Sequence, residues 1–279
     1  MLRLMRSSRA RVAAAVGIAF LAGFSRGSEA RSAGGLLARM GPPEIMSERF
    51  TGVVVTLFLD KKLVQSWLPE GLTLAESPHA EHPVIILYGT ERGLARHKRI
   101  TIHPRFGRCF RETFVGVPYL RREGCPGKEP VFHFVRVYVD SARAASQGIR
   151  RFGWPKVCTA IDVQDGNYRI LGGPSGSLLE GRAEDDRLEP VQPDNASLRH
   201  VQQMLTQTLV LEHRGCFDHY DFDFHFDGAT VRSMPAEVQI QEGFMPGLPP
   251  RTVKSAGIGR EDYGAFFIDC RITKTPCQP

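Results

Sequence analysis

The sequence lacks an apolar run long enough to cross a membrane as a helix. The most apolar run, from Val12 to Phe24, has thirteen residues, whereas a spanning helix needs about 20. Four arginines and no acidic residue precede it, and Ser28-Glu29-Ala30 follows it. This order is typical of a secretory signal peptide. We therefore expect residues 1–30 to be removed after Ala30 and the protein to be exported (periplasmic or secreted); an uncleaved anchor is the alternative.

A strong excess of one charge is also missing once this segment is set aside. The whole chain has a formal charge of +6, but residues 1–30 hold five arginines and one glutamate, which leaves +2 on residues 31–279. No stripe of basic residues with interleaved aromatics occurs, so a nucleic-acid partner is not indicated. The remaining length suits one large domain, residues 31–279.

The six cysteines include no Cys-x-x-Cys pair, which argues against a zinc ribbon or a thioredoxin-like site. An even number of cysteines in an exported protein favours disulfides. The preferred pairs are Cys109 with Cys125, which would close a hairpin, and Cys270 with Cys277. A buried free thiol is an equal alternative for Cys158.

Most of the chain has a strand-like pattern of apolar and β-branched residues. Helical spacing is confined to residues 61–67, 141–149 and 198–211. Many strands and few helices predict a mostly β (α+β) fold with an antiparallel, barrel-like core and peripheral helices. The expected strands are 51–59, 83–88, 110–120, 131–140, 158–163, 168–171, a pair formed by 220–226 and 230–240, and 265–272.

The run from Gly148 to Val157 contains a single lysine, Lys156. Its neighbours are apolar or positively charged: Arg150, Arg151, Phe152, Trp154, Pro155 and Val157. A lysine of ordinary pKa, about 10.4, is almost wholly protonated at neutral pH and is a poor nucleophile. Apolar packing and nearby cations disfavour the ammonium form. The segment therefore predicts a nucleophilic lysine that forms a Schiff base with a ketone; a surface lysine on a proline turn is the alternative.

Several landmarks follow one another in a recognisable order. They are a helix that ends in Leu-Pro-Glu-Gly-Leu, a strand with a glutamate ahead of a proline, a Tyr-x-Asp strand end, a helix of small residues and Gly-x-x-x-x-Gly-Trp-Pro-Lys. Their positions are Leu68–Leu72, Glu112–Pro118, Tyr138–Asp140, Ala142–Gly148 and Gly148–Lys156. This order resembles the acetoacetate decarboxylase family, from about Arg49 to the last strand. The resemblance implies an acetoacetate decarboxylase-like fold, a reaction without cofactor or metal, and a homo-oligomer.

The resemblance also implies roles for individual residues. Lys156 would form the Schiff base, and Glu112 would orient the substrate or transfer a proton. Substrate binding would fall to Arg49, Arg151 and Trp154. The alternative for Glu112 is a solvated strand acid paired with its neighbour Arg111.

Two features depart from the family pattern. Family members commonly have Arg-Glu where this chain has Arg150-Arg151, and a second lysine often follows the first where this chain has Val157. Neighbouring side chains of an extended segment point to opposite faces, so a second lysine need not share the pocket. Burial of Lys156 would then disfavour its ammonium form. A further family glutamate has no obvious counterpart, since Leu87 or Tyr88 occupies its place and Glu91 lies a few residues away.

A second constellation lies between Glu212 and Asp227. His213, Cys216 and His219 have metal-like spacing, and alternating acids follow them. An amphipathic strand with its acids in water is the favoured interpretation, so no metal site is expected. No glycine-rich phosphate loop follows a strand, and no Gly-x-Ser-x-Gly motif occurs.

These observations predict an enzyme that decarboxylates acetoacetate or a related small 3-oxo acid through Lys156. One alternative keeps the Schiff base and condenses pyruvate with an aldehyde, as aldolase-dehydratase relatives of the family do. Another is a barrel that binds a small molecule without catalysis.

Overall fold

Strands dominate the part of the chain that the computed structural model describes. The described residues are 44–75, 80–97, 100–101, 109–123, 130–164, 167–183, 189–190, 195–213, 216–224, 231–255 and 265–276. The expected signal peptide lies outside them. None of the helices in these ranges is long and apolar enough to span a membrane. The mostly β fold expected from the sequence is confirmed.

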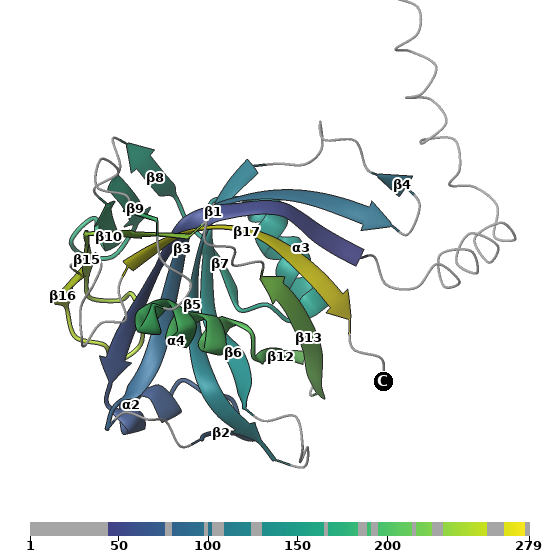
Figure 1. The fold of residues 1–279 in the computed structure, drawn as a ribbon, viewed down its shortest axis with the longest axis horizontal. Helices are drawn as coiled ribbons and strands as arrows, with labels where there is room; N and C mark the ends of the chain where they lie inside the picture. The colour runs from purple at the N-terminus through teal and green to yellow at the C-terminus, as the bar shows by residue number, and fades with distance from the viewer. Residues whose placement is uncertain are drawn as a thin grey trace, which may run out of the picture. The chain divides into compact units, whose positions relative to one another are not determined.

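The described elements are three helices and seventeen strands (Figure 1). The helices are α2 (Lys61–Gln65), α3 (Ala142–Phe152) and α4 (Ala196–Leu205). The strands are β1 (Glu44–Leu59), β2 (Leu72–Leu74), β3 (His82–His97), β4 (Ile100–Thr101), β5 (Cys109–Arg122), β6 (Val131–Val139), β7 (Lys156–Cys158), β8 (Ile161–Gln164), β9 (Asn167–Leu171), β10 (Ser177–Ala183), β11 (Glu189–Pro190), β12 (Thr208–His213), β13 (Cys216–Phe224), β14 (Val231–Met234), β15 (Ala236–Ile240), β16 (Arg251–Ser255) and β17 (Ala265–Pro276).

The long strands form a barrel-like sheet. Its order is β1-β3-β5-β6-β12-β13-β17, and β17 also pairs with β1, which brings the two ends of this path together. Most pairings are antiparallel, as expected, but β6 is parallel to both β7 and β12. A second sheet of five strands, in the order β16-β15-β10-β9-β8, was not expected from the sequence.

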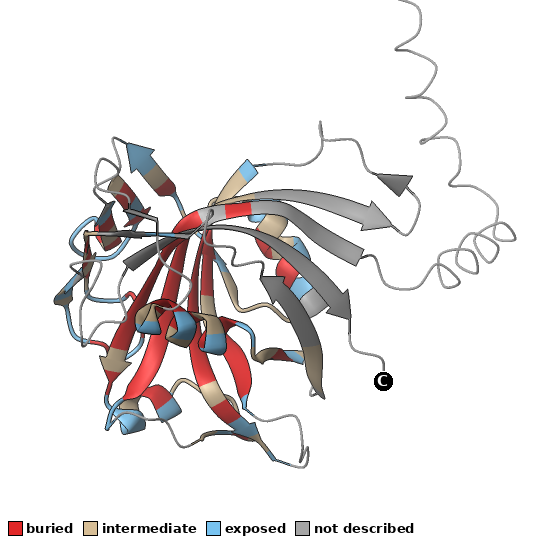
Figure 2. Ribbon diagram, in the orientation of Figure 1, coloured by how far each residue is buried: buried red, intermediate tan, exposed pale blue. Residues whose placement is uncertain are grey.

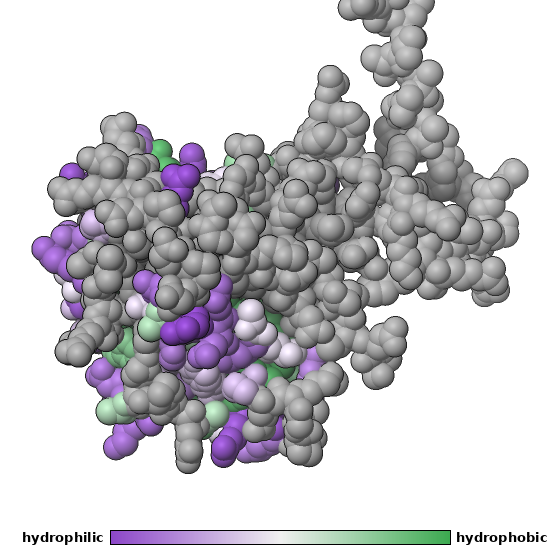
Figure 3. Space-filling model, viewed as in Figure 1, coloured by the Kyte–Doolittle hydropathy of each residue, from purple (hydrophilic) through white to green (hydrophobic). Residues whose placement is uncertain are grey.

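The described residues of β1, β3, β5 and β6 are mostly buried (Figure 2). One face, which includes Val54, Leu87 and Phe114, packs against α4, and Figure 1 shows this helix lying across the strands. Side chains on the opposite face pack against the five-stranded sheet. Because successive residues of a strand point to opposite faces, the described residues of β1, β3, β5 and β6 contribute to both cores. Figure 3 shows that the described part of one outer surface is mainly hydrophilic.

Two expected elements were wrong. Residues 198–211 were expected to form one helix, but α4 ends at Leu205 and β12 begins at Thr208. Residues 209–211 are all buried, and such a short apolar run fits a helix or a strand equally well. The expected pair of strands 220–226 and 230–240 is also wrong. Pro235, which has no N–H to donate, separates β14 from β15, and β17 lies between β13 and β14.

The expected disulfide between Cys109 and Cys125 does not form, because Cys109 is free and exposed. Cys109 begins β5 and Arg122 ends it. An extended strand of this length separates its ends by roughly 40 Å, far beyond the reach of a disulfide. Cys158 is also free, but it is exposed rather than buried. Cys277 lies outside the described residues, so its pairing with Cys270 stays a prediction.

Candidate active site

Lys156 is placed by a tight turn between α3 and β7. The helix ends at Gly153, which adopts a left-handed conformation with φ of 64°. The N–H of Lys156 then donates to the Trp154 carbonyl oxygen at 2.7 Å, and the N–H of Val137 donates to the Pro155 carbonyl oxygen at 2.9 Å. Through this contact the chain joins β6 as the parallel strand β7.

The side chain of Lys156 is 8% exposed, so the surface-lysine alternative is wrong. In register, Lys156 lies beside Val137, whose side chain is in the core that packs against α4. The next residue, Val157, is 39% exposed. The expected alternation is therefore confirmed: a side chain at position 157 does not share the surroundings of Lys156.

Glu112 lies on the same face of the sheet and is fully buried. It is paired with Gly89 of β3 and Val139 of β6. Its Oε1 atom accepts a hydrogen bond from Nζ of Lys156, whose side chain reaches across β6. The alternative of a solvated acid paired with Arg111 is wrong. Arg111 interacts with Asp140 instead, with 3.6 Å between Nη1 and Oδ2.

Aromatic rings and a glycine surround the lysine side chain. Nζ of Lys156 lies 5.0 Å from the ring centroid of Trp154 and 5.6 Å from that of Phe110, distances at which a cation is attracted to the ring face. The methylene groups of the lysine run against Gly148 of α3, where an added Cβ would lie 2.7 Å from Cδ. Gly148 therefore leaves the space through which Lys156 reaches Glu112.

Burial raises the pKa of Glu112 to about 8, against the opposing effect of the Lys156 charge. The carboxylate of Glu91 raises the pKa of Glu112 further. In the sequence, Glu91 lies a few residues from the place of the further family glutamate, for which no obvious counterpart was found. Leu87, Gly89 and Glu91 share one face of β3, and the pairing of Gly89 with Glu112 brings Glu91 near. Glu91 is identified as a neighbour of Glu112 only by the register of β3 against β5.

The structure describes only some of the other expected site residues. Trp154 lies beside Lys156, as described above. The side chains of Arg49 on β1 and Arg151 on α3 lie outside what the structure describes. Arg150 is exposed and donates to Oγ of Ser146 at 3.0 Å. Among the described residues, no three His, Cys, Asp or Glu side chains form a group that could hold a metal ion.

No family model matches the sequence, and no curated protein does. Solved structures do match. The chain is similar to the enduracididine biosynthesis enzyme MppR complexed with the condensation product of pyruvate and imidazole 4-carboxaldehyde. The identity is 16%, the TM-score is 0.55, and the match covers 84% of this chain and 87% of that one. The fold is acetoacetate decarboxylase-like.

Two further matches support that fold. Acetoacetate decarboxylase from Legionella pneumophila is 14% identical with a TM-score of 0.52, over 84% of this chain and 87% of that one. An acetoacetate decarboxylase-like enzyme from Sphingomonas wittichii is 12% identical with a TM-score of 0.50, over 86% and 95%. The fold implied by the order of landmarks in the sequence is thus confirmed.

We predict that Gly153→Ala destabilises the protein by about 3 kcal/mol, because a left-handed alanine and a steric clash add together. An added Cβ would lie 2.4 Å from the Glu212 carbonyl oxygen. Gly176→Ala is the control, since its φ is 85° but nothing lies within 4 Å; it should cost only about 1 kcal/mol. Urea unfolding measures both, and equal losses would contradict the prediction.

We predict that Gly148→Ala lowers the rate of reductive alkylation of Lys156 by about tenfold or more, because the lysine stem must move. Thermal stability should change little, since alanine favours the helix by about 1 kcal/mol over glycine. Gln147→Ala, at an exposed position of the same helix, is the control and should react like the parent protein. Unchanged labelling of Gly148→Ala would show that the stem does not need this space.

Proposed function

We propose that this protein is a Schiff-base-forming lyase that decarboxylates acetoacetate or a related small 3-oxo acid. The observation that carries the proposal is the hydrogen bond between Nζ of Lys156 and the fully buried carboxyl group of Glu112. Separated charges are costly in an apolar environment. Burial raises the pKa of Glu112, which favours a carboxyl group that holds a proton beside Nζ of Lys156.

A neutral Lys156 starts the reaction as the nucleophile. Its Nζ lone pair attacks the ketone carbon to give a carbinolamine. The carboxyl group of Glu112 then donates its proton to the carbinolamine oxygen. Water leaves, and a protonated ketimine remains on Nζ beside the Glu112 carboxylate.

The ketimine is the electron sink for decarboxylation. The bond between the α-carbon and the carboxylate breaks, its electrons move to the ketimine nitrogen, and carbon dioxide leaves an enamine. Glu112, once it has regained a proton from water, protonates the α-carbon. Hydrolysis then releases the ketone and Lys156. A cation such as Arg49 or Arg151 would hold the substrate carboxylate, although a tight salt bridge would stabilise the ground state and slow the reaction.

Condensation of pyruvate with an aldehyde is a second candidate. The observation that favours it is the similarity in fold to MppR, which has been solved with pyruvate and with a pyruvate condensation product. In this reaction the ketimine of pyruvate loses a proton from its methyl group. The resulting enamine attacks the aldehyde, and loss of water follows. Lys156 again carries the ketimine, and the Glu112 carboxylate left by ketimine formation accepts the methyl proton.

We predict that borohydride with acetoacetate or pyruvate adds irreversible mass at Lys156, because reduction fixes the ketimine. Peptide mass spectrometry locates the modification. Lys156→Arg should abolish both labelling and turnover, because the guanidinium stays protonated; full activity of this variant would rule out both enzymatic candidates. A protein that only binds a small molecule would show no labelling. Release of carbon dioxide from acetoacetate then supports decarboxylation, whereas product formation from pyruvate and an aldehyde supports condensation.

We predict that the rate of borohydride trapping falls as the pH rises through about 8, the raised pKa of Glu112. Below this value the carboxyl group holds the proton that removes water from the carbinolamine, and above it that proton is lost. Glu112→Gln should lose this alkaline fall and trap about 100-fold more slowly. The measurement is the initial trapping rate across the neutral and alkaline range, and an alkaline fall that persists in Glu112→Gln would assign it to another group.

A further inference from the structure

The face of β5 opposite to the Glu112 carboxylate is attached to the five-stranded sheet. Arg111 donates from Nη1 to the Ile161 carbonyl oxygen of β8 at 3.0 Å, and its N–H donates to Oδ1 of Asp140 at 3.0 Å. Thr113 contacts Tyr168 of β9. Of the three consecutive residues 111–113 of β5, Glu112 has its side chain in the site, whereas Arg111 and Thr113 contact the second sheet.

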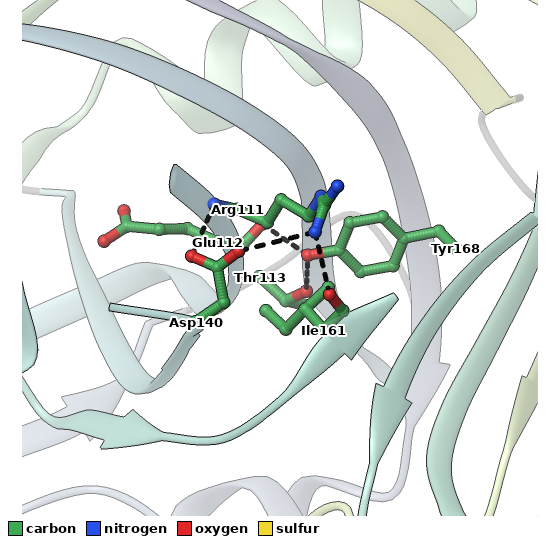
Figure 4. Close-up of polar contacts among 6 residues, drawn as sticks. All are labelled: Arg111, Glu112, Thr113, Asp140, Ile161 and Tyr168. Carbon is green, nitrogen blue, oxygen red and sulfur yellow. Dashed lines mark hydrogen bonds and ion pairs between the residues drawn. The ribbon is translucent and has the colours of Figure 1, made fainter. Parts of the chain in front are cut away.

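Tyr168 makes the contact that involves Glu112 itself. Its hydroxyl donates to the main-chain carbonyl oxygen of Glu112 at 3.0 Å and lies 2.9 Å from Oγ1 of Thr113. A phenol has one proton to donate, so the Thr113 hydroxyl is the donor to Tyr168. Figure 4 shows the Tyr168 hydroxyl between the main chain at Glu112 and Thr113, with the Glu112 carboxylate pointing away from it. All three residues are buried.

A second buried tyrosine provides an internal comparison. Tyr88 of β3 packs against Tyr168, with 4.9 Å between the ring centroids. Its hydroxyl has no hydrogen-bond partner among the residues that the structure describes. The two rings thus share one environment, but only the hydroxyl of Tyr168 contacts the strand that carries Glu112.

We propose that Tyr168 is a positioning residue, which fixes the main chain at Glu112 from the second sheet and thereby holds the carboxyl group against Lys156. The inference rests on the proposed function of the Lys156–Glu112 pair. Groups that exchange protons must be held within a fraction of an ångström, by supporting contacts that are themselves locked. Burial raises the pKa of Tyr168, so its hydroxyl keeps the proton that it donates to Glu112.

The test compares Tyr168→Phe with Tyr88→Phe in the full-length protein. Each variant loses one buried hydroxyl and keeps its ring. Tyr168→Phe should slow borohydride trapping of Lys156 with acetoacetate by about tenfold. It should also move the alkaline fall to lower pH, because a loosened carboxyl group gains water and its pKa decreases. Tyr88→Phe should leave both unchanged. Thr113→Val should act like Tyr168→Phe but more weakly, and Thr113→Ser, which keeps the hydroxyl, should behave like the parent protein.

A second measurement keeps this inference separate from the proposed function. Carbon-13 NMR follows the titration of the Glu112 carboxyl group, whose signal is assigned by its loss in Glu112→Gln. A lower pKa of Glu112 in Tyr168→Phe, but not in Tyr88→Phe, supports the positioning role even if no ketone labels Lys156. Absence of labelling in the parent protein overturns the proposed function alone. An unchanged Glu112 titration in Tyr168→Phe overturns the positioning role, whatever happens to thermal stability.

Discussion

The contact between Lys156 and Glu112 inside an apolar interior is the constraint on which the rest of the site depends. Removing two charged groups from water costs several kcal/mol per ion, and their attraction offsets this only when the geometry is good. Here the carboxyl group is fully buried, the lysine is nearly so, and aromatic rings lie beside Nζ. A pair that shares one proton avoids much of this cost. The proposed ketimine chemistry requires an amine beside a proton donor, and the pair places Nζ against the Glu112 carboxyl group.

Two glycines and one strand make this contact possible. Gly153 lets the chain reverse beside β12, and Gly148 lets the lysine stem lie against α3. β5 then supplies Glu112 at the centre of the large sheet, with β3 on one side and β6 on the other. Because side chains alternate, one face of the strand contacts Lys156 and the other contacts the second sheet. The second sheet therefore contributes to the site, because it carries Tyr168, whose hydroxyl contacts the main chain at Glu112.

The sequence predicted what depends on local pattern. The apolar neighbours of Lys156 predicted that its side chain is packed, and alternation along the strand predicted different surroundings for residues 156 and 157. Glu112 was identified from its motif. Contacts that depend on the register of the strands could not be predicted from the sequence. Glu91 joins the site only because Gly89 is paired with Glu112, and Tyr168 reaches β5 from a sheet that no local pattern indicated. The apolar run at 209–211 fits two kinds of element, and only its place between β6 and β13 decides that it is a strand.

Val157 bears on which groups lie close to Nζ of Lys156. A lysine at this position would have offered a second positive charge near Nζ, but the exposure of Val157 shows that its side chain points away from the buried pair. A charge there would act through solvent and be screened. The proposed mechanism therefore relies on the buried surroundings of Lys156 and on Glu112, whose pKa burial raises. This argument applies equally to the two proposed reactions, decarboxylation and pyruvate condensation, since each begins with the formation of a ketimine on Lys156. The choice between them depends on which substrate binds, and not on the contact between Lys156 and Glu112.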